Sequence, residues 1–447
     1  MHMEKPVVSV VKYKEPLASV RKAIDLADGF KRLKPGSKVF IKPNVVYWNR
    51  LVPFPKWGMI TTSRVMEDTI TLLAERGVKD ITIGEGIITY DPKDKETPAD
   101  AWEKLGYNTL AKRYGVKIVN LFEGPYKKVD IGCDFPANVS AYALDADFFI
   151  DMPVLKTHTQ AMVSLGIKNL KGLLDMATRK KFHGADPVKN LHFNVAHLSN
   201  KIKPALTIID GIYTLERGPA MNGSAHRKDI LVASTDLLSA DLAGAKLLGF
   251  EPASVKHLAM TAHEAGRPAD LSDVTLVGDP VESLASHHEW EFQYNDAGDL
   301  PLPFYKQGMK GIKYRKYDDT MCTYCSDINA IILMGIKFAW DGTTPFDNIE
   351  VLTGKVMKPT PGMKKTILVG QCMCNACKDN PDIQQSIMIK GCPPSKETLK
   401  DAMEKAGIDL PDMFYNNLDK GAGTFMAKYR GKPEFDEEFY QVVETRT

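Results

Sequence analysis

The sequence lacks the features of a membrane-spanning or nucleic-acid-binding protein. It contains no run of about 18 apolar residues, so we expect no transmembrane helix. Its 58 Lys and Arg residues are nearly balanced by 56 Asp and Glu, and a net charge of +2 gives no general attraction to nucleic acid. The N-terminal stretch MHMEKPVVSVVKY has no apolar segment before a small-residue cleavage site. We therefore predict a cytoplasmic protein without a secretory signal.

Three common nucleotide-binding and hydrolase motifs are also missing. The stretch IGEG at 83–86 does not extend to GxGxxG, and neither GxxxxGK[ST] nor GxSxG occurs. The sequence therefore gives no indication of a dinucleotide fold, a P-loop or a serine hydrolase.

Cysteine is scarce in the first two thirds of the chain and concentrated in the last third. Cys133 stands alone and is readily explained as a small buried hydrophobe. In a reducing compartment, clustered cysteines are more often metal ligands or catalytic groups than disulfides. Three interpretations remain open at this point: a structural zinc ion, an iron–sulfur cluster and a redox dithiol. The clustered cysteines are Cys322, Cys325, Cys372, Cys374, Cys377 and Cys392.

The first part of the chain alternates between strand and helix patterns. Such alternation predicts a mostly parallel α/β sheet with helices on both faces. Strands are expected at 7–13, 38–44, 80–86, 205–211, 229–234 and 273–279 and within 146–158, and helices at 16–33, 63–76, 189–201, 236–248 and 253–265.

A smaller, cysteine-rich α/β domain is expected at the C-terminal end. Residues 280–320 show no clear periodicity and are interpreted as a connector. Beyond them, helices are predicted at 323–338 and 395–407 and strands at 348–354 and 365–371. We place the domains at 1–285 and 286–447.

Polar residues follow several of the predicted strands. Because ligands of open α/β sheets bind outside the carboxyl ends of the strands, these side chains together indicate a crevice. The candidates for substrate or cofactor binding are Lys42, Asn44, Lys156, Asn169 and Asp210; Glu85 occupies a similar place.

The densest polar stretch is MPVLKTHTQAMVSLGIKNLKG at 152–172, followed by ATRKKFHG at 177–184. His158 and His183 are the acid/base candidates, because imidazole titrates near neutral pH. Lys168 is a candidate nucleophile or base, since a lysine near other cations has a lowered pKa. His192 and His197 are five residues apart, which puts them on different helix faces and argues against a ligand pair.

The sequence contains the stretches PVLKTHTQAMVSLGIKNLKG, IIDGIYTLERGPAMNG and STDLLSADLAGAKLLG, together with CTYC, LVGQC and IKGCPPS. These stretches resemble the domain of unknown function 362 family. The resemblance implies an α/β domain and a [4Fe-4S] cluster bound by Cys322, Cys325, Cys372 and Cys392. Cys374 and Cys377 are alternatives for the third ligand, and zinc is the alternative metal.

The spacing His158…Lys168, with a histidine near 183, is also distantly similar to the nickel-pincer lactate racemase family. In that family a His and a Lys ten residues apart hold the cofactor. The family's Arg-Pro-Thr-Pro signature is missing here, where the chain has KPNVVYW, so we do not transfer nickel or racemase activity.

These observations predict an iron–sulfur enzyme, of oxidoreductase or Lewis-acid type, acting on a small anionic molecule in a cytoplasmic, anaerobic setting. Two alternatives are an electron-transfer or assembly protein with a non-catalytic crevice, and a zinc-stabilised binding protein. A redox partner protein and a homodimer are expected, and neither nucleic acid nor membrane is.

Overall fold

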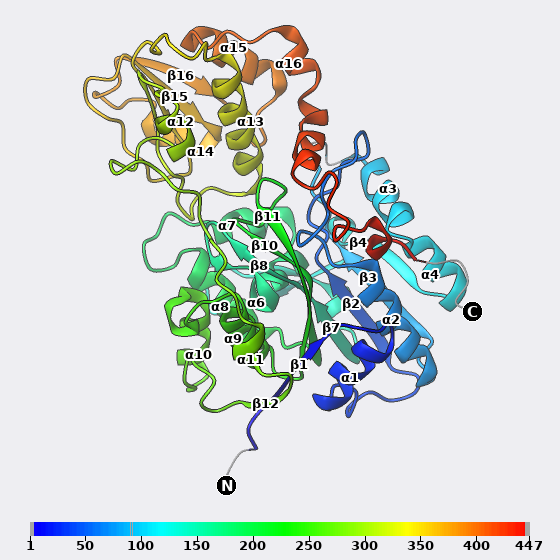
Figure 1. Ribbon diagram of the computed structural model, residues 1–447. Coiled ribbons are helices and arrows are strands. Elements are labelled where there is room, and N and C mark those ends of the chain that lie inside the picture. The colour runs from blue at the N-terminus through cyan, green and yellow to red at the C-terminus, as the bar shows by residue number, and fades with distance from the viewer. Residues whose placement is uncertain (1–3, 90, 92, 443–447) are drawn as a thin grey trace. The chain divides into compact units, whose positions relative to one another are not determined.

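A large, mostly parallel sheet organises the first of two units in the chain (Figure 1). The computed structural model describes residues 4–89, 91 and 93–442. The first unit comprises the chain up to Arg179, His192–Glu291 and the residues from Ala422 on, and the second comprises Lys180–Leu191 and Phe292–Gly421. The chain therefore leaves the first unit and returns to it, whereas the sequence prediction continued the second domain to residue 447.

The sheet of the first unit has the strand order β12-β1-β11-β10-β7-β2-β3-β4, with β8 beside β10 and β9 beside β8. The pairs joining β7, β2, β3 and β4 are parallel, and β11 is antiparallel to both neighbours. The bounds are β1 Val7–Lys12, β2 Lys38–Pro43, β3 Asp80–Glu85, β4 Lys117–Asn120, β7 Phe148–Met152, β8 Val154–His158, β9 Met162–Val163, β10 Leu206–Glu216, β11 Ser224–Ser234 and β12 Thr275–Gly278; β5 Tyr126–Val129 and β6 Ala137–Ser140 form a separate hairpin.

Helices lie on both faces of this sheet, with α1 and α2 on one face and α6 and α9 on the other (Figure 1). The predicted mostly parallel α/β fold is confirmed. The helices are α1 Ala18–Leu26, α2 Ser63–Glu75, α3 Glu96–Lys104, α4 Tyr107–Tyr114, α5 Ala141–Leu144, α6 Leu165–Asn169, α7 Met176–Phe182, α8 Leu191–Lys201, α9 Leu237–Leu247, α10 Lys256–Glu264 and α11 Val281–Leu284, with short 3₁₀ turns η1 Leu121–Glu123, η2 Leu170–Leu173 and η3 Pro252–Ser254.

The stretch 146–158, within which a strand was expected, contains two, because Pro153 separates β7 from β8. Proline has no N–H for the ladder, while its carbonyl oxygen accepts a hydrogen bond of 2.8 Å from the Asp210 amide. The break moves β8 away from β7 and onto β10.

The second unit contains a four-stranded parallel sheet, in the order β13-β14-β15-β16. Its first strand lies inside the stretch 280–320 that was interpreted as a connector. Three residues are too few to show a period in the sequence, which explains the miss. The bounds are β13 Ile312–Tyr314, β14 Ile349–Leu352, β15 Lys365–Val369 and β16 Gln385–Ile389, with α12 Leu302–Lys306, α13 Thr323–Ala339, α14 Gly370–Cys377, α15 Lys396–Ala406 and α16 Asp412–Asn416.

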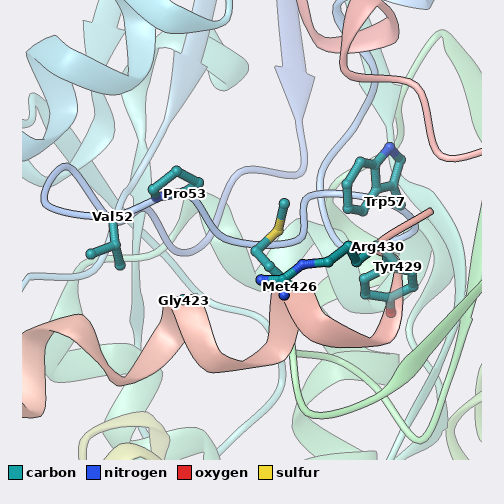
Figure 2. A pocket seen from close by; sticks show the side chains of 7 residues that line it. All are labelled: Val52, Pro53, Trp57, Gly423, Met426, Tyr429 and Arg430. Carbon is teal, nitrogen blue, oxygen red and sulfur yellow. The ribbon is translucent and has the colours of Figure 1, made fainter. Parts of the chain in front are cut away.

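The last described residues, in η4 Leu418–Lys428 and η5 Glu437–Tyr440, complete the core of the first unit. The ring of Tyr429 lies 5.1 Å from that of Trp57, and Tyr440 stacks on Tyr213 at 6.3 Å. Figure 2 shows a cavity of about 320 Å³ between Trp57, Met426 and Arg430 in this region. None of the described helices has both the length and the apolar character needed to cross a bilayer.

Candidate functional site

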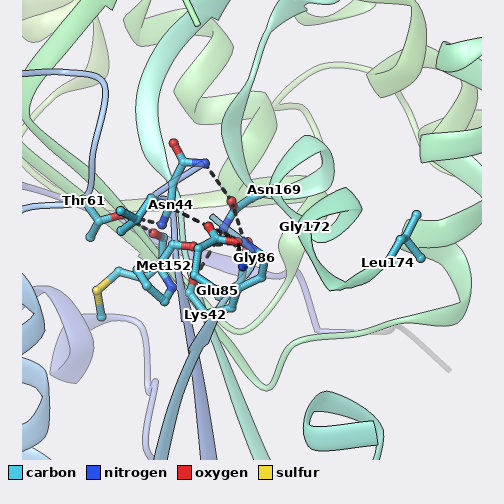
Figure 3. Close-up of polar contacts among 12 residues, drawn as sticks. Lys42, Asn44, Thr61, Glu85, Gly86, Met152, Asn169, Gly172 and Leu174 are labelled. Atoms are coloured by element: carbon cyan, nitrogen blue, oxygen red, sulfur yellow. Dashed lines mark hydrogen bonds and ion pairs between the residues drawn. The ribbon is translucent and has the colours of Figure 1, made fainter. Parts of the chain in front are cut away.

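Polar side chains from β2 and β3 meet at the carboxyl edge of the large sheet, as the sequence predicted (Figure 3). Lys42 at the end of β2 is fully buried, and its Nζ donates to Glu85 Oε2 at 3.1 Å, Asn169 Oδ1 at 3.1 Å and Pro43 O at 3.0 Å. Glu85 also accepts from the amides of Val45 and Gly86, at 2.9 and 2.8 Å. Both charges are therefore compensated inside the protein.

Two asparagines link this ion pair to its neighbours. Asn169 Nδ2 donates to Asp151 Oδ1 at 2.8 Å, while its Oδ1 accepts from Asn44 Nδ2 at 3.2 Å. Asn44 in turn accepts from Lys156 Nζ at 2.5 Å. We call these residues, together with Lys42 and Glu85, the buried polar network.

Burial sets the protonation of this network. It lowers the pKa of Lys156 to about 7, although the charge of Glu85 acts in the opposite direction. Burial likewise raises the pKa of Asp151 to about 7, against the effect of Lys42. Few net charges are therefore held in the interior at neutral pH, as the high cost of burying unpaired charge requires.

Asp210 accepts hydrogen bonds that the sequence did not indicate. Its Oδ2 accepts from both the amide and the hydroxyl of Thr62 at 2.7 Å, and its Oδ1 from the Ile212 amide at 3.1 Å. Thr62 is the N-cap of α2. Asp210 thus fixes the start of α2 against β10.

Lys168 and His158, two of the predicted site residues, lie in direct contact. Lys168 Nζ is 3.1 Å from His158 Nε2, and the Gln160 amide donates to His158 Nδ1 at 3.1 Å. Burial, followed by the charge of Arg179, lowers the pKa of Lys168 to about 8. A base and an amine are therefore held together at the end of β8.

The short helix that carries Lys168 is held by a buried carboxylate. Asp241 on α9 accepts from the amides of Gly166 and Ile167, both at 2.8 Å, at the start of α6. Burial raises the pKa of Asp241 well above its usual value. A side chain added at Gly166 would lie 2.9 Å from Asp241 Oδ1, so this approach requires glycine.

Some residues near Lys168 were missed as site residues. Arg179 acts on Lys168 through its charge, and its guanidinium stacks on Phe122 at 4.5 Å. His257 is fully buried, with neither ring nitrogen hydrogen-bonded in the described structure, and its ring stacks on His192 at 6.0 Å. His257 belongs to a helix far along the chain, so no local motif could have indicated it.

His183 belongs to the second unit, so the structure does not join it to the Lys168–His158 pair. Its Nδ1 lies 2.7 Å from the carbonyl oxygen of Asp319 in the same unit. A carbonyl only accepts hydrogen bonds, so the proton of a neutral His183 ring resides on Nδ1. Its acid/base role stays a prediction.

Four cysteines gather at the carboxyl edge of the second sheet. Cys322 is the N-cap of α13, and Cys325 lies in the first turn of that helix. Cys372 lies in the first turn of α14, which follows β15, and Cys392 follows β16. The hydrogen bond with Cys322, followed by burial and the charges of Cys322, Cys372 and Cys392, raises the pKa of Cys325. The four thiols are thus electrostatic neighbours.

Several features near these cysteines favour thiolates. The hydrogen bond from Cys325 comes first, and with helix amides and Lys355 it lowers the pKa of Cys322 to about 5. Lys180 Nζ lies 3.7 Å from Cys392 Sγ. Both lysines belong to the same unit as the cysteines.

Cys374 and Cys377 have different surroundings. Both are buried in an apolar cluster with Leu368 and Met373. Cys374 Sγ donates to Leu368 O at 3.4 Å, and burial raises the pKa of both thiols. These surroundings favour Cys372 over either of them as a ligand.

No group of three or more His, Cys, Asp or Glu side chains among the described residues is arranged to hold a metal ion. In a four-iron cluster each thiolate binds a different iron atom, so its ligands stand farther apart than those of one ion. The shared edge and the neighbouring lysines of Cys322, Cys325, Cys372 and Cys392 fit such a cluster.

The fold and the polar edge define a class: α/β proteins with lysine and histidine side chains at the carboxyl ends of parallel strands. Residues 39–246 match the model of the Domain of unknown function (DUF362) family. The match covers Lys42 to Asp241 and leaves the clustered cysteines outside it. The family resemblance seen in the sequence is confirmed.

Two individual proteins are similar to parts of the chain. The thylakoid-associated protein sll1697 of Synechocystis sp. (strain ATCC 27184 / PCC 6803 / Kazusa) is 29% identical over 247 residues, which are 54% of this chain and 73% of that protein. The lactate racemase apoprotein from Thermoanaerobacterium thermosaccharolyticum is 13% identical with a TM-score of 0.36, over 55% of this chain and 57% of that one.

Proposed function

We propose that the protein is an iron–sulfur enzyme that binds a small anionic molecule in the crevice of its first unit. Cys322, Cys325, Cys372 and Cys392 would hold a [4Fe-4S] cluster. Such a cluster exchanges single electrons or, with an iron atom open to ligands, acts as a Lewis acid. The proposal places the protein in the cytoplasm, where thiols stay reduced.

The observation that carries this proposal is the gathering of four cysteines from three separate segments at one sheet edge. Three of them lie at helix N-termini and two have a lysine close by, and such positive surroundings suit a group of anionic ligands. Free thiols with a purely structural role require no such surroundings. Cys374 and Cys377, which are buried in an apolar cluster, have the surroundings of ordinary buried thiols.

The crevice supports the second half of the proposal. Arg179 supplies positive charge close to Lys168, and His158 beside Lys168 can move a proton at the same place. The buried polar network behind them holds its own charges compensated. An anion would therefore be attracted to the Lys168 side of the crevice.

The test is anaerobic purification followed by iron, sulfide and zinc counts, an absorbance spectrum, and EPR after reduction. We expect about four irons per chain and a visible band that dithionite bleaches. A colourless protein with about one zinc would contradict the cluster and favour the zinc-stabilised alternative.

Matched variants test the ligands. We expect Cys372→Ser to lose most of its iron, whereas Cys374→Ser and Cys377→Ser keep theirs. The reverse pattern would show that the third ligand is assigned wrongly.

The exposure of Cys372 and Cys392 also favours a second candidate, an electron-transfer protein with a redox partner. In that case the cluster would exchange electrons with the partner while Lys168→Arg left electron transfer unchanged. An enzyme would lose turnover in the same variant.

A further inference from the structure

The first unit buries four lysines, Lys42, Lys156, Lys168 and Lys171, and the hydrogen bonds of the first three differ in kind. Lys42 Nζ has three oxygen acceptors, and so does Lys156 Nζ: Asn44 Oδ1 at 2.5 Å, Met59 O at 2.7 Å and Pro219 O at 3.5 Å. An ammonium group has three N–H donors, so both sites suit the charged form. Both side chains are also closed off from solvent, at 0% and 1% exposure.

Lys168 has a different environment. Its Nζ has one hydrogen-bond partner in the described structure, and that partner is a ring nitrogen rather than an oxygen. It keeps 8% of its surface exposed, as does His158. Of these three lysines, Lys168 is therefore the most exposed.

The hydrogen bonds of His158 decide which form of Lys168 the pair holds. The Gln160 N–H points at Nδ1, so Nδ1 must offer a lone pair. A neutral imidazole has one acceptor nitrogen, so Nε2 then carries the proton. Nε2–H donates to Lys168 Nζ, which can accept only as an uncharged amine.

Burial shifts the protonation equilibrium toward the uncharged amine, which makes up about a tenth of Lys168 at pH 7 with a pKa of about 8. A shift of the Lys168 pKa from 10.5 to about 8 raises the uncharged fraction at pH 7 by about 300-fold. An uncharged amine is the nucleophilic form of lysine.

We propose that Lys168 forms an imine with a small anionic carbonyl compound of the 2-oxo acid class, and this rests on the crevice being the substrate site. The amine nitrogen of Lys168 adds to the carbonyl carbon to give a carbinolamine. Loss of water then gives the C=N bond, so the step needs no oxidant or reductant.

The neighbouring side chains supply what this step requires. His158 Nε2–H donates its proton to the departing hydroxyl and takes back a proton from the amine, so the imidazole ends as it began. Arg179, whose charge already acts on Lys168, attracts the carboxylate of the acid.

The experiment is reductive trapping on the full-length protein. Pyruvate or 2-oxoglutarate is added with cyanoborohydride, and modified lysines are mapped by peptide mass spectrometry. Reduction of the imine leaves one acid molecule, less one oxygen atom, on the lysine nitrogen. We expect this adduct on Lys168 well ahead of every other lysine.

Variants and a second probe sharpen the result. Lys171→Arg removes a neighbouring lysine and should leave trapping unchanged, whereas Lys168→Arg should abolish it. His158→Asn removes the proton donor and should slow trapping by about 100-fold. The adduct map of the wild-type protein alone shows whether Lys168 is the reactive lysine. A variant that fails to fold therefore does not change that conclusion.

Calorimetry with pyruvate and with lactate, which lacks the carbonyl, separates the two proposals. If the acids bind but Lys168 carries no adduct with either oxo acid, the imine is refuted and the anion crevice stands. If none of the acids binds and no adduct forms, the crevice assignment fails together with the imine, whatever the iron count.

Discussion

A single methyl group added beside Cys325 provides the sharpest test of the second unit's geometry. Gly370 begins α14 with a φ of +83°, and a Cβ there would lie 2.6 Å from Cys325 Sγ. Gly362, in the loop before β15, has nearly the same φ of +85° but no heavy atom within 4 Å of its Cβ position. The two glycines therefore differ in the contact and not in the backbone.

The expected costs follow from that difference. Alanine in the left-handed region costs about 1–2 kcal/mol at either position. The overlap with Cys325 adds about 1–3 kcal/mol at Gly370 alone, since the sulfur or the helix must shift. We therefore expect Gly370→Ala to destabilise the second unit by about 2–5 kcal/mol, and Gly362→Ala by about 1–2 kcal/mol.

Hydrogen exchange of peptides from β15 and α14, followed by mass spectrometry, measures this unit separately from the first. The same two variants, purified anaerobically, report iron content. Gly370→Ala should lose iron because Cys325 is displaced, and Gly362→Ala should retain it. Equal destabilisation in both variants, with equal iron, would refute the close packing of Gly370 on Cys325.

Three further predictions concern the first unit. Lys42→Met should lower the free energy of chemical unfolding by about 3–5 kcal/mol, because it leaves the buried Glu85 charge without its partner. Glu75→Gln, in an exposed ion pair, should lower it by under about 1 kcal/mol. Similar losses in the two variants would contradict the buried polar network. Trapping at Lys168 should rise with pH to a plateau just above its pKa of about 8, because the uncharged amine is the reactant, and a rise continuing to 10.5 would place Lys168 in solvent. Asp241→Ala should slow imine trapping, because α6 loses the carboxylate that holds its first amides. Asp241→Asn should stay closer to the wild-type rate. Unchanged trapping rates in both variants would show that α6 does not need this carboxylate.

Much of the first unit could be predicted because its strands are buried β-branched runs and its helices carry a clear period. The edge that unites Lys42, Glu85 and Asn169 followed from one rule, that parallel strands end together. Contact between Lys168 and His158 followed from their position on one loop and the next helix. These are consequences of local sequence.

The remainder depends on contacts between distant segments. Nothing around Asp210 reveals that it holds the N-cap residue of α2, because that partner, Thr62, lies 148 residues away. The differing roles of Lys156 and Lys168 are set by their acceptors, and a sequence pattern shows only that both are lysines. The second sheet escaped full prediction because β13 is three residues long.

The return of the chain to the first unit has a consequence for synthesis. Tyr429 and Tyr440 complete a core whose other members, including Trp57 and Tyr213, are made hundreds of residues earlier. A ribosome makes the N-terminal part of a chain first, so all of the second unit is available to fold before these last rings emerge. The core of the first unit therefore cannot be completed until the second unit has been translated in full. A chain truncated just before Tyr429 would contain all of the cysteine-bearing unit but would lack the last rings of the first core.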